Sequence, residues 1–146
     1  MLSHLKASFA RPFTNSFKWI KAKDIDLTKI YSVGNTLHSQ GFVTFDMTTN
    51  RSHIPGDEII CTPALVNKMN LLLLNSTNSQ LPPNHASVTT QVICQHKAPL
   101  PMGEHYHITA KARKVAAENA EFDVVFQNDN NKIIGEATIK IGVIEF

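Results

Sequence analysis

The segment from Thr62 to Ser76 constrains the fold more than any other part of this chain. Thr is favoured where a helix begins, and a Pro, here Pro63, is tolerated at the first helical position because no backbone N–H is needed there. The apolar residues that follow cover nearly the whole helical circumference: Ala64, Leu65, Val66, Met69 and Leu71 to Leu74. A helix that is apolar on most sides must be buried. We therefore predict one central helix, enclosed by a sheet or by a second copy of the chain.

Strand-like runs lie on both sides of this segment in the sequence. Thr36–Met47 alternates as a strand does, and the turn-rich stretch Thr48–Glu58 after it predicts a loop. Four further strands, separated by short turn-forming segments, are predicted after the helix: about Ser87–His96, Glu104–Val115, Ala120–Gln127 and Ile133–Ile144. Strands that follow one another with tight connections pair in an antiparallel sheet.

Alternation within these runs separates a buried face from a polar face. In the second of the four, Tyr106, Ile108, Ala110 and Ala112 oppose His105, His107, Thr109, Lys111 and Arg113. In the third, Ala120, Phe122, Val124 and Phe126 oppose Glu121, Asp123 and Gln127. An antiparallel sheet with one polar face needs cover on its apolar face, which the single helix supplies. The pattern predicts an α+β fold, a curled sheet around one helix.

Composition narrows the classes of function. The chain has 146 residues, enough for one domain, and its 42% hydrophobic content supports a core without disulfides or metal. Its two cysteines, Cys61 and Cys94, are far apart and show no metal-ligand spacing, so reduced thiols are expected. Residues 24–146 carry nine basic and twelve acidic residues, which argues against nucleic-acid binding. No phosphate-binding glycine loop, GxSxG or HExxH motif occurs.

The first 23 residues differ from the rest. They hold five basic residues, three serines and no acid, and their apolar residues recur every three or four positions. These features are typical of a mitochondrial transit peptide, which would place the protein in the matrix. The alternative is an N-terminal arm packed on the domain of a cytoplasmic protein. We therefore divide the chain into a basic amphipathic segment, 1–30, and a domain, 31–146.

Three stretches of the body resemble one protein family. They are CTPALVNKMN (Cys61–Asn70), VTTQVICQHKAPLPMG (Val88–Gly103) and the ending IGEATIKIGVIEF. Together with the expected helix and sheet, they resemble the fluoroacetyl-CoA thioesterase-like branch of the hotdog thioesterase superfamily, over about residues 31–146. The resemblance implies a hotdog fold, a homodimer with sites between subunits, and catalysis by a Thr, an acid and a His, without a cofactor.

Of that catalytic set, the chain matches the Thr at Thr62 and the His at His96. His96 shares one strand face with Val88, Val92 and Cys94, so it is expected to point inward, where it is either a core histidine or a general base. Thr62 is expected as the helix N-cap, and in the functional interpretation it also lines the site.

The start of the helix offers an oxyanion-binding site. Pro63 has no N–H, so the backbone N–H groups of Ala64 and Leu65 are the expected donors to a thioester carbonyl.

Two positions depart from the family pattern. The helix acid is replaced by Asn70, and the Arg of the last strand is replaced near Lys140 and Ile141. An amide can hold a water or a carbonyl but cannot accept a proton as a carboxylate does. Asn70 is therefore either a weakened member of the catalytic set or a buried amide paired across an interface or with Asn67.

His105 and His107, two residues apart on the polar face, have the spacing of a metal-binding pair. No third ligand is evident from the sequence, and a solvated sheet face explains both. No metal site is therefore expected.

The leading hypothesis is a homodimeric hydrolase of acyl-CoA or acyl-carrier thioesters, weakened by Asn70. The runner-up is a non-catalytic hotdog domain that binds acyl-CoA or serves as a structural subunit of a larger assembly. A dehydratase acting on 3-hydroxyacyl thioesters ranks last, because it too would need the missing acid.

Overall fold

A computed structural model of the chain describes residues 20–22, 24–49 and 58–146. The segment 1–23, interpreted above as a targeting sequence, therefore lies almost entirely outside the described residues. Most of the loop expected over Thr48–Glu58 lies outside them as well. Within the described part, none of the helices is long and apolar enough to cross a membrane. The elements are β1 (Ile20–Lys21), η1 (Leu27–Lys29), β2 (Thr36–Phe42), η2 (Phe45–Met47), α2 (Thr62–Asn78), β3 (His85–His96), β4 (His105–Val115), β5 (Asn119–Asn128) and β6 (Ile133–Glu145).

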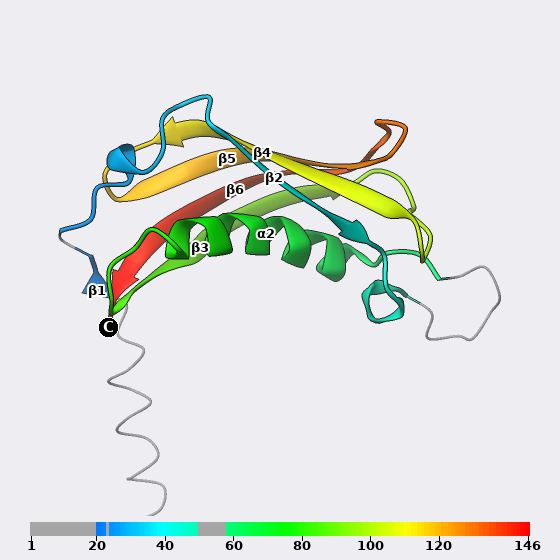
Figure 1. Cartoon of the computed structure of the whole chain (residues 1–146), viewed down its shortest axis with the longest axis horizontal. Helices are drawn as coiled ribbons and strands as arrows, with labels where there is room; N and C mark the ends of the chain where they lie inside the picture. The colour runs from blue at the N-terminus through cyan, green and yellow to red at the C-terminus, as the bar shows by residue number, and fades with distance from the viewer. Residues whose placement is uncertain (1–19, 23, 50–57) are drawn as a thin grey trace, which may run out of the picture.

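The central helix forms where it is predicted. Helix α2 runs from Thr62 to Asn78 and lies along the concave side of a curved sheet (Figure 1). Its fully buried residues recur every four positions and so form one stripe against the sheet: Leu65, Met69, Leu73 and Thr77. The opposite side is not covered by the described residues of the chain, and Leu71 is 37% exposed there. The sheet therefore encloses only one side of this apolar helix.

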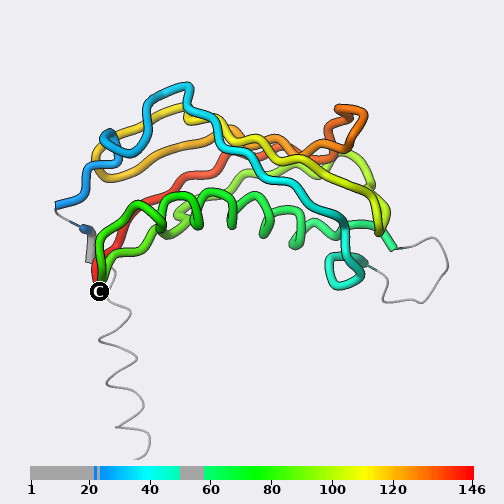
Figure 2. Tube along the Cα trace, in the orientation of Figure 1, coloured from blue at the N-terminus to red at the C-terminus, as the bar shows by residue number. Residues whose placement is uncertain are grey.

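All strand pairs are antiparallel, and the main order across the sheet is β2-β4-β5-β6-β3. The short β1 pairs with the end of β6. The sheet bends along the length of the helix (Figure 2). The predicted faces of β4 and β5 are confirmed, because Tyr106, Ile108, Phe122 and Phe126 are all buried. The α+β prediction is thus confirmed, with one helix on one face of the sheet.

The first predicted strand is too long. Strand β2 ends at Phe42, and Phe45–Met47 forms a 3₁₀ turn instead of continuing the strand. This turn buries Met47 and leaves Phe45 exposed. Backbone hydrogen bonds within the turn, from Met47 N–H to the Thr44 carbonyl, replace those of a strand ladder.

Strand β3 contains a β-bulge, and because of it the side chains before the bulge point to the face opposite to the predicted one. Its register with β6 shifts between Thr89 and Gln91. An extra residue moves the following side chains to the other face. Cys94 and Val92 pair with the inward-facing Ala137 and Ile139, as predicted for the strand end that carries His96. Val88, before the bulge, lies on the outer face, so its assignment to the His96 face was wrong. The inward residues there are Ser87 and Thr89.

The described end of the basic N-terminal segment packs on the domain. Ala22 and Leu27 belong to the buried core, although both precede residue 31. Just beyond them, the buried Tyr31 ring meets Phe122 edge-on at 5.1 Å, and its hydroxyl lies 2.8 Å from the Thr77 hydroxyl of α2. The residues before β2 therefore close one end of the space between helix and sheet.

Candidate active site at the start of the central helix

Thr62 and His96 meet where α2 begins and β3 ends. The Thr62 Oγ1 atom lies 2.9 Å from Nδ1 of His96, within hydrogen-bond distance. Thr62 is exposed and His96 is half-buried, so the pair can be reached from solvent. The structure thus brings together two of the residues that the sequence singles out for catalysis.

A glycine on β6 permits this close approach of helix and sheet. Gly135 pairs with His96 in the strand register. A Cβ atom at Gly135 would lie 2.7 Å from Cδ2 of Leu65, in the first turn of α2. Any larger residue would push the helix start away from β3 and β6, and with it Thr62 away from His96.

The structure assigns Thr62 a different role from the predicted one. The N-cap residue of α2 is Cys61, whose side chain makes no capping hydrogen bond, and Thr62 is the first helical residue. The Thr62 hydroxyl is directed to His96 instead of to the backbone of its own helix. The N-cap prediction was therefore wrong by one residue. The hydroxyl is left free for the imidazole because the cap lies one position earlier.

The expected pair of oxyanion donors also changes. The N–H of Leu65 donates to the Cys61 carbonyl at 3.0 Å, so it is already used within the helix. Its selection as a free donor was wrong, because the hydrogen-bond ladder begins one residue earlier than a Thr62 cap would give. The N–H of Ala64 has no acceptor among the described residues. Ala64 therefore remains as a backbone donor beside the Thr62 hydroxyl.

The far side of the His96 ring is enclosed by protein. Its Nε2 atom is buried and has no hydrogen-bond partner among the described residues. A shallow depression of about 410 Å³ borders the ring and is lined by Ile59, His96, Lys97, Ala98 and Pro99. Cys94 lies two residues before His96 on the same face of β3. Burial raises the pKa of its thiol above the ordinary value. A thiol of raised pKa stays protonated at neutral pH.

Asn70 is separated from this pair within one chain. It lies eight residues after Thr62 on the same helix, which corresponds to about 12 Å along the axis. Its side-chain oxygen accepts a hydrogen bond from the hydroxyl of Thr89, on β3 beside the bulge. Neither Asn67 nor the Thr62–His96 pair is its partner. Thr89 was missed in the sequence because strict alternation places it on the outer face.

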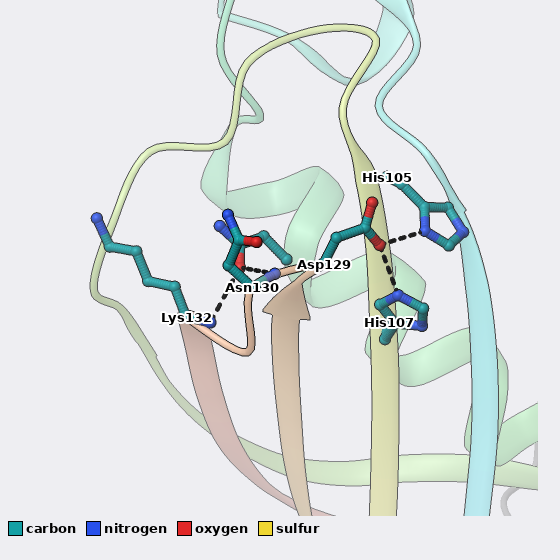
Figure 3. Close-up of polar contacts among 6 residues, drawn as sticks. His105, His107, Asp129, Asn130 and Lys132 are labelled. Atoms are coloured by element: carbon teal, nitrogen blue, oxygen red, sulfur yellow. Dashed lines mark hydrogen bonds and ion pairs between the residues drawn. The ribbon is translucent and has the colours of Figure 1, made fainter.

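A second cluster of polar side chains lies on the opposite face of the sheet. His105 and His107 of β4 both contact the carboxylate of Asp129, in the turn between β5 and β6 (Figure 3). The sequence shows Asp129 only as one of several turn-forming residues, so a third candidate ligand, which is not evident from the sequence, becomes visible only in the structure. A hairpin turn can reach a neighbouring strand, and no spacing in the sequence signals that contact.

Comparison with known proteins shows which family and which solved structures the chain is similar to. A family model described as fluoroacetyl-CoA-specific thioesterase (FlK) matches residues 43–145. A mutant of FlK solved with fluoroacetate and CoA is 23% identical, with a TM-score of 0.70 over 80% of this chain and 97% of that chain. A hot-dog-like protein from Thermanaerovibrio acidaminovorans is 20% identical, with a TM-score of 0.73 over 83% of this chain and 89% of that chain.

A thioesterase superfamily member from Thermus thermophilus is also similar, at 18% identity and a TM-score of 0.68 over 78% of this chain and 84% of that chain. No curated protein sequence matches the chain. At these identities the solved structures establish the hotdog fold. The family model spans both Thr62 and His96 together with the elements that carry them. The chain therefore belongs to the FlK family of hotdog-fold thioesterases, whose members hydrolyse acyl-CoA thioesters.

Proposed function

We propose that this protein hydrolyses acyl-CoA thioesters at the Thr62–His96 pair. The observation that carries the proposal is the 2.9 Å contact between the Thr62 hydroxyl and His96 Nδ1 at the exposed start of a helix. A hydroxyl bonded to an imidazole is the basic arrangement for an activated nucleophile or an activated water. Membership of a family of thioester hydrolases gives this chemistry its substrate class.

The contact supports a two-step reaction. Nδ1 of His96 takes the Thr62 proton as Oγ1 attacks the thioester carbonyl carbon. The carbon–sulfur bond then breaks, and the leaving thiolate takes the proton back from Nδ1, which gives the free thiol and an acyl ester on Thr62. In the second step His96 takes a proton from water, the resulting hydroxide attacks the ester, and the proton returns to Thr62 as the free acid leaves.

The start of the helix stabilises the negative charge that develops on the carbonyl oxygen. The Ala64 N–H has no acceptor among the described residues and lies in the first turn, where the helix dipole also favours negative charge. Backbone donors fixed in this way stabilise an oxyanion without reorganising. Ala64 thus provides the donor that was first expected from Ala64 and Leu65 together.

Asn70 is proposed to weaken the activity. Where the family has an acid, the amide can orient water or substrate through hydrogen bonds but cannot accept a proton. The same replacement favours a second candidate function, a non-catalytic hotdog domain that binds acyl-CoA without turnover. The two are separated by whether free thiol appears when the protein meets an acyl-CoA.

We also propose that two copies form the working unit. The edge of β3 that faces away from β6 has no partner strand among the described residues, and Val92 and Ile93 on it are 37% and 61% exposed. Leu71, on the uncovered side of α2, is exposed as well. Pairing along this edge would cover the apolar helix side, and it offers a way to bring Asn70 of one copy toward the Thr62–His96 pair of the other.

The basic segment 1–23 is proposed to direct the chain to the mitochondrion. Its support is compositional, namely five basic residues, three serines and no acid. A fusion of these residues to a fluorescent protein is expected to enter mitochondria. A fusion in which the five basic residues are replaced by Gln is the control. Uniform cytosolic fluorescence of the parent fusion would overturn this assignment.

Thiol release from a panel of short acyl-CoAs tests the main proposal. The parent protein is expected to release free thiol, and His96→Ala to abolish the release because the base is lost. His85→Ala is the matched control, since His85 lies on the same strand but bonds to the carbonyl of Pro83. Saturable binding without thiol release would select the non-catalytic function. Release that survives in His96→Ala would remove His96 from the mechanism.

A further inference from the structure

We propose that His105, His107 and Asp129 form a binding site for a divalent transition-metal ion on the outer face of the sheet. Nδ1 of His105 and Nε2 of His107 lie 2.6 and 2.8 Å from the same carboxylate oxygen of Asp129. The three potential ligand atoms all lie within 4.8 Å of one another. Two imidazole nitrogens and one carboxylate that converge in this way can coordinate one ion.

The two histidines are held in position by their neighbours. They alternate along β4 with the buried Tyr106, which fixes their direction to the outer face. The His105 ring packs between Phe42, at 4.9 Å, and His107, at 4.4 Å between centroids. Phe42 is paired with His105 across the β2–β4 ladder, so this packing follows from the strand register. Both rings therefore present their nitrogens without a change of the backbone.

The turn that carries Asp129 is braced independently of the histidines. The side-chain oxygen of Asn128 accepts hydrogen bonds from the backbone N–H groups of Asn130 and Lys132, each at 2.9 Å (Figure 3). Asn131 adopts a left-handed conformation, with φ of 61°, which closes the turn and which Asn tolerates better than most residues. The Lys132 side chain points away from the two imidazoles (Figure 3). The third ligand is thus held beside the pair, and the Lys132 cation of the same turn is directed away from it.

The donor set selects the class of ion. Imidazole nitrogen suits Zn²⁺, Cu²⁺ and Ni²⁺, whereas Ca²⁺ and Mg²⁺ prefer sites made only of oxygen. Three protein ligands leave a further coordination position for water, as in open zinc sites. All three side chains are partly exposed, so an ion can enter directly from solvent. Zn²⁺ is the ion that we expect, at about 2.0–2.1 Å from each nitrogen.

The site is distinct from the Thr62–His96 pair. His105 and His107 lie on the face of the sheet opposite to α2, whereas Thr62 belongs to α2 itself. Bound metal would link the start of β4 to the β5–β6 turn and hold this end of the sheet together. This role is independent of thioester hydrolysis, so failure of one proposal leaves the other standing.

Calorimetric titration of the metal-free full chain with Zn²⁺ tests the site. Parent, His107→Gln and Asp129→Asn proteins are compared, with His38→Gln as the matched control. His38 lies on the same outer face, on β2, and bonds to Thr109 instead of Asp129. The parent is expected to bind one equivalent of Zn²⁺ that both ligand variants bind more than about tenfold more weakly. The His38→Gln protein should match the parent.

Imidazole nitrogen resonances, followed by NMR during the same titration, identify the ligands. The His105 Nδ1 and His107 Nε2 signals are expected to move with the first equivalent of Zn²⁺. Equal affinity and stoichiometry in the parent and Asp129→Asn proteins would overturn the proposal. So would a first equivalent that shifts other histidines and leaves these two unchanged.

Discussion

At the scale of single residues, we propose that Asn70 limits the activity of this protein. Its side-chain oxygen is already an acceptor for the Thr89 hydroxyl, and the residue is half-buried between helix and strand. A carboxylate at the same place would accept the same hydrogen bond, because its oxygens are acceptors too. We therefore expect Thr89 to make the position tolerant of the acid that the resemblance implies there.

Replacing Asn70 by Glu is expected to raise thioester hydrolysis. Acid–base assistance is typically worth about 10²–10⁴ in rate, so the gain should fall in or below that range. Asn70→Asp, which is one methylene shorter, should gain less. Initial rates of thiol release, with thermal unfolding to verify folding, provide the measurement. Burial of a new charge is expected to lower the melting temperature somewhat.

Asn67→Glu is the matched control for this change. Asn67 lies one turn earlier on the same helix but is exposed, so the added charge is the same while the contact with Thr89 is absent. If the folded Asn70→Glu protein is no faster than the parent, and the parent is inactive, loss of catalysis is not a matter of one residue. The non-catalytic function would then take first place.

At the scale of elements, the last strand positions the site through one of its glycines. A Cβ atom at Gly135 would overlap Leu65, which is fully buried and cannot move aside without disturbing the core. At Gly142 of the same strand, the nearest atoms to an added Cβ are 3.7 and 3.8 Å away, an ordinary contact. The two glycines therefore differ in the space beside them.

Gly135→Ala is expected to lower the free energy of unfolding by about 1–3 kcal/mol, the usual cost of overpacking a filled core. It should also slow thiol release, because the start of α2 carries Thr62. Gly142→Ala should be close to neutral in both respects. Denaturant unfolding and initial rates measure the two effects. A Gly135→Ala protein as stable and as active as Gly142→Ala would show that this close approach is not needed.

The elements also show which features can be predicted from sequence. Apolar alternation gives the faces of β4 and β5 correctly, since Ile108 to Ala112 of β4 pair without a register shift with Phe126 to Phe122 of β5. The same reasoning fails for strand β3, because the bulge near Thr89 reverses which side chains face inward. No sequence signal such as a glycine marks this bulge. The helix and its first residue are predicted by the sequence, yet its N-cap residue is not, because Cys61 caps it without a side-chain hydrogen bond.

At the scale of the whole molecule, the described part of one chain covers the central helix on one side only. The sheet packs on the stripe that contains Leu65 and Met69, while Leu71 remains exposed. The prediction of a fully enclosed helix therefore depends on a second copy. The periodicity of one chain shows which side of a helix is apolar but not which surface covers it. The sequence alone therefore could not tell whether the sheet or a second copy of the chain covers each side of the helix.

The protein is expected to be a dimer, with a molecular mass by sedimentation of about twice the 16.2 kDa of one chain. Changing both Val92 and Ile93 to Lys should give monomers, because like charges on a strand edge oppose pairing. Val33→Lys is the control, since Val33 is 68% exposed but lies outside β3. Sedimentation velocity distinguishes the species. A monomeric parent, or a double variant that remains dimeric, would contradict pairing through this edge.

The central claim is that the Thr62 hydroxyl and His96 act together on a thioester. The most direct test is the rate of thiol release from a short acyl-CoA by Thr62→Val and Thr62→Ser proteins. Val keeps the shape of Thr but lacks the hydroxyl, so Thr62→Val is expected to lose about 10²–10⁴ in rate, whereas Thr62→Ser should retain most of it. Folded Thr62→Val protein that hydrolyses the acyl-CoA as fast as the parent would contradict the account.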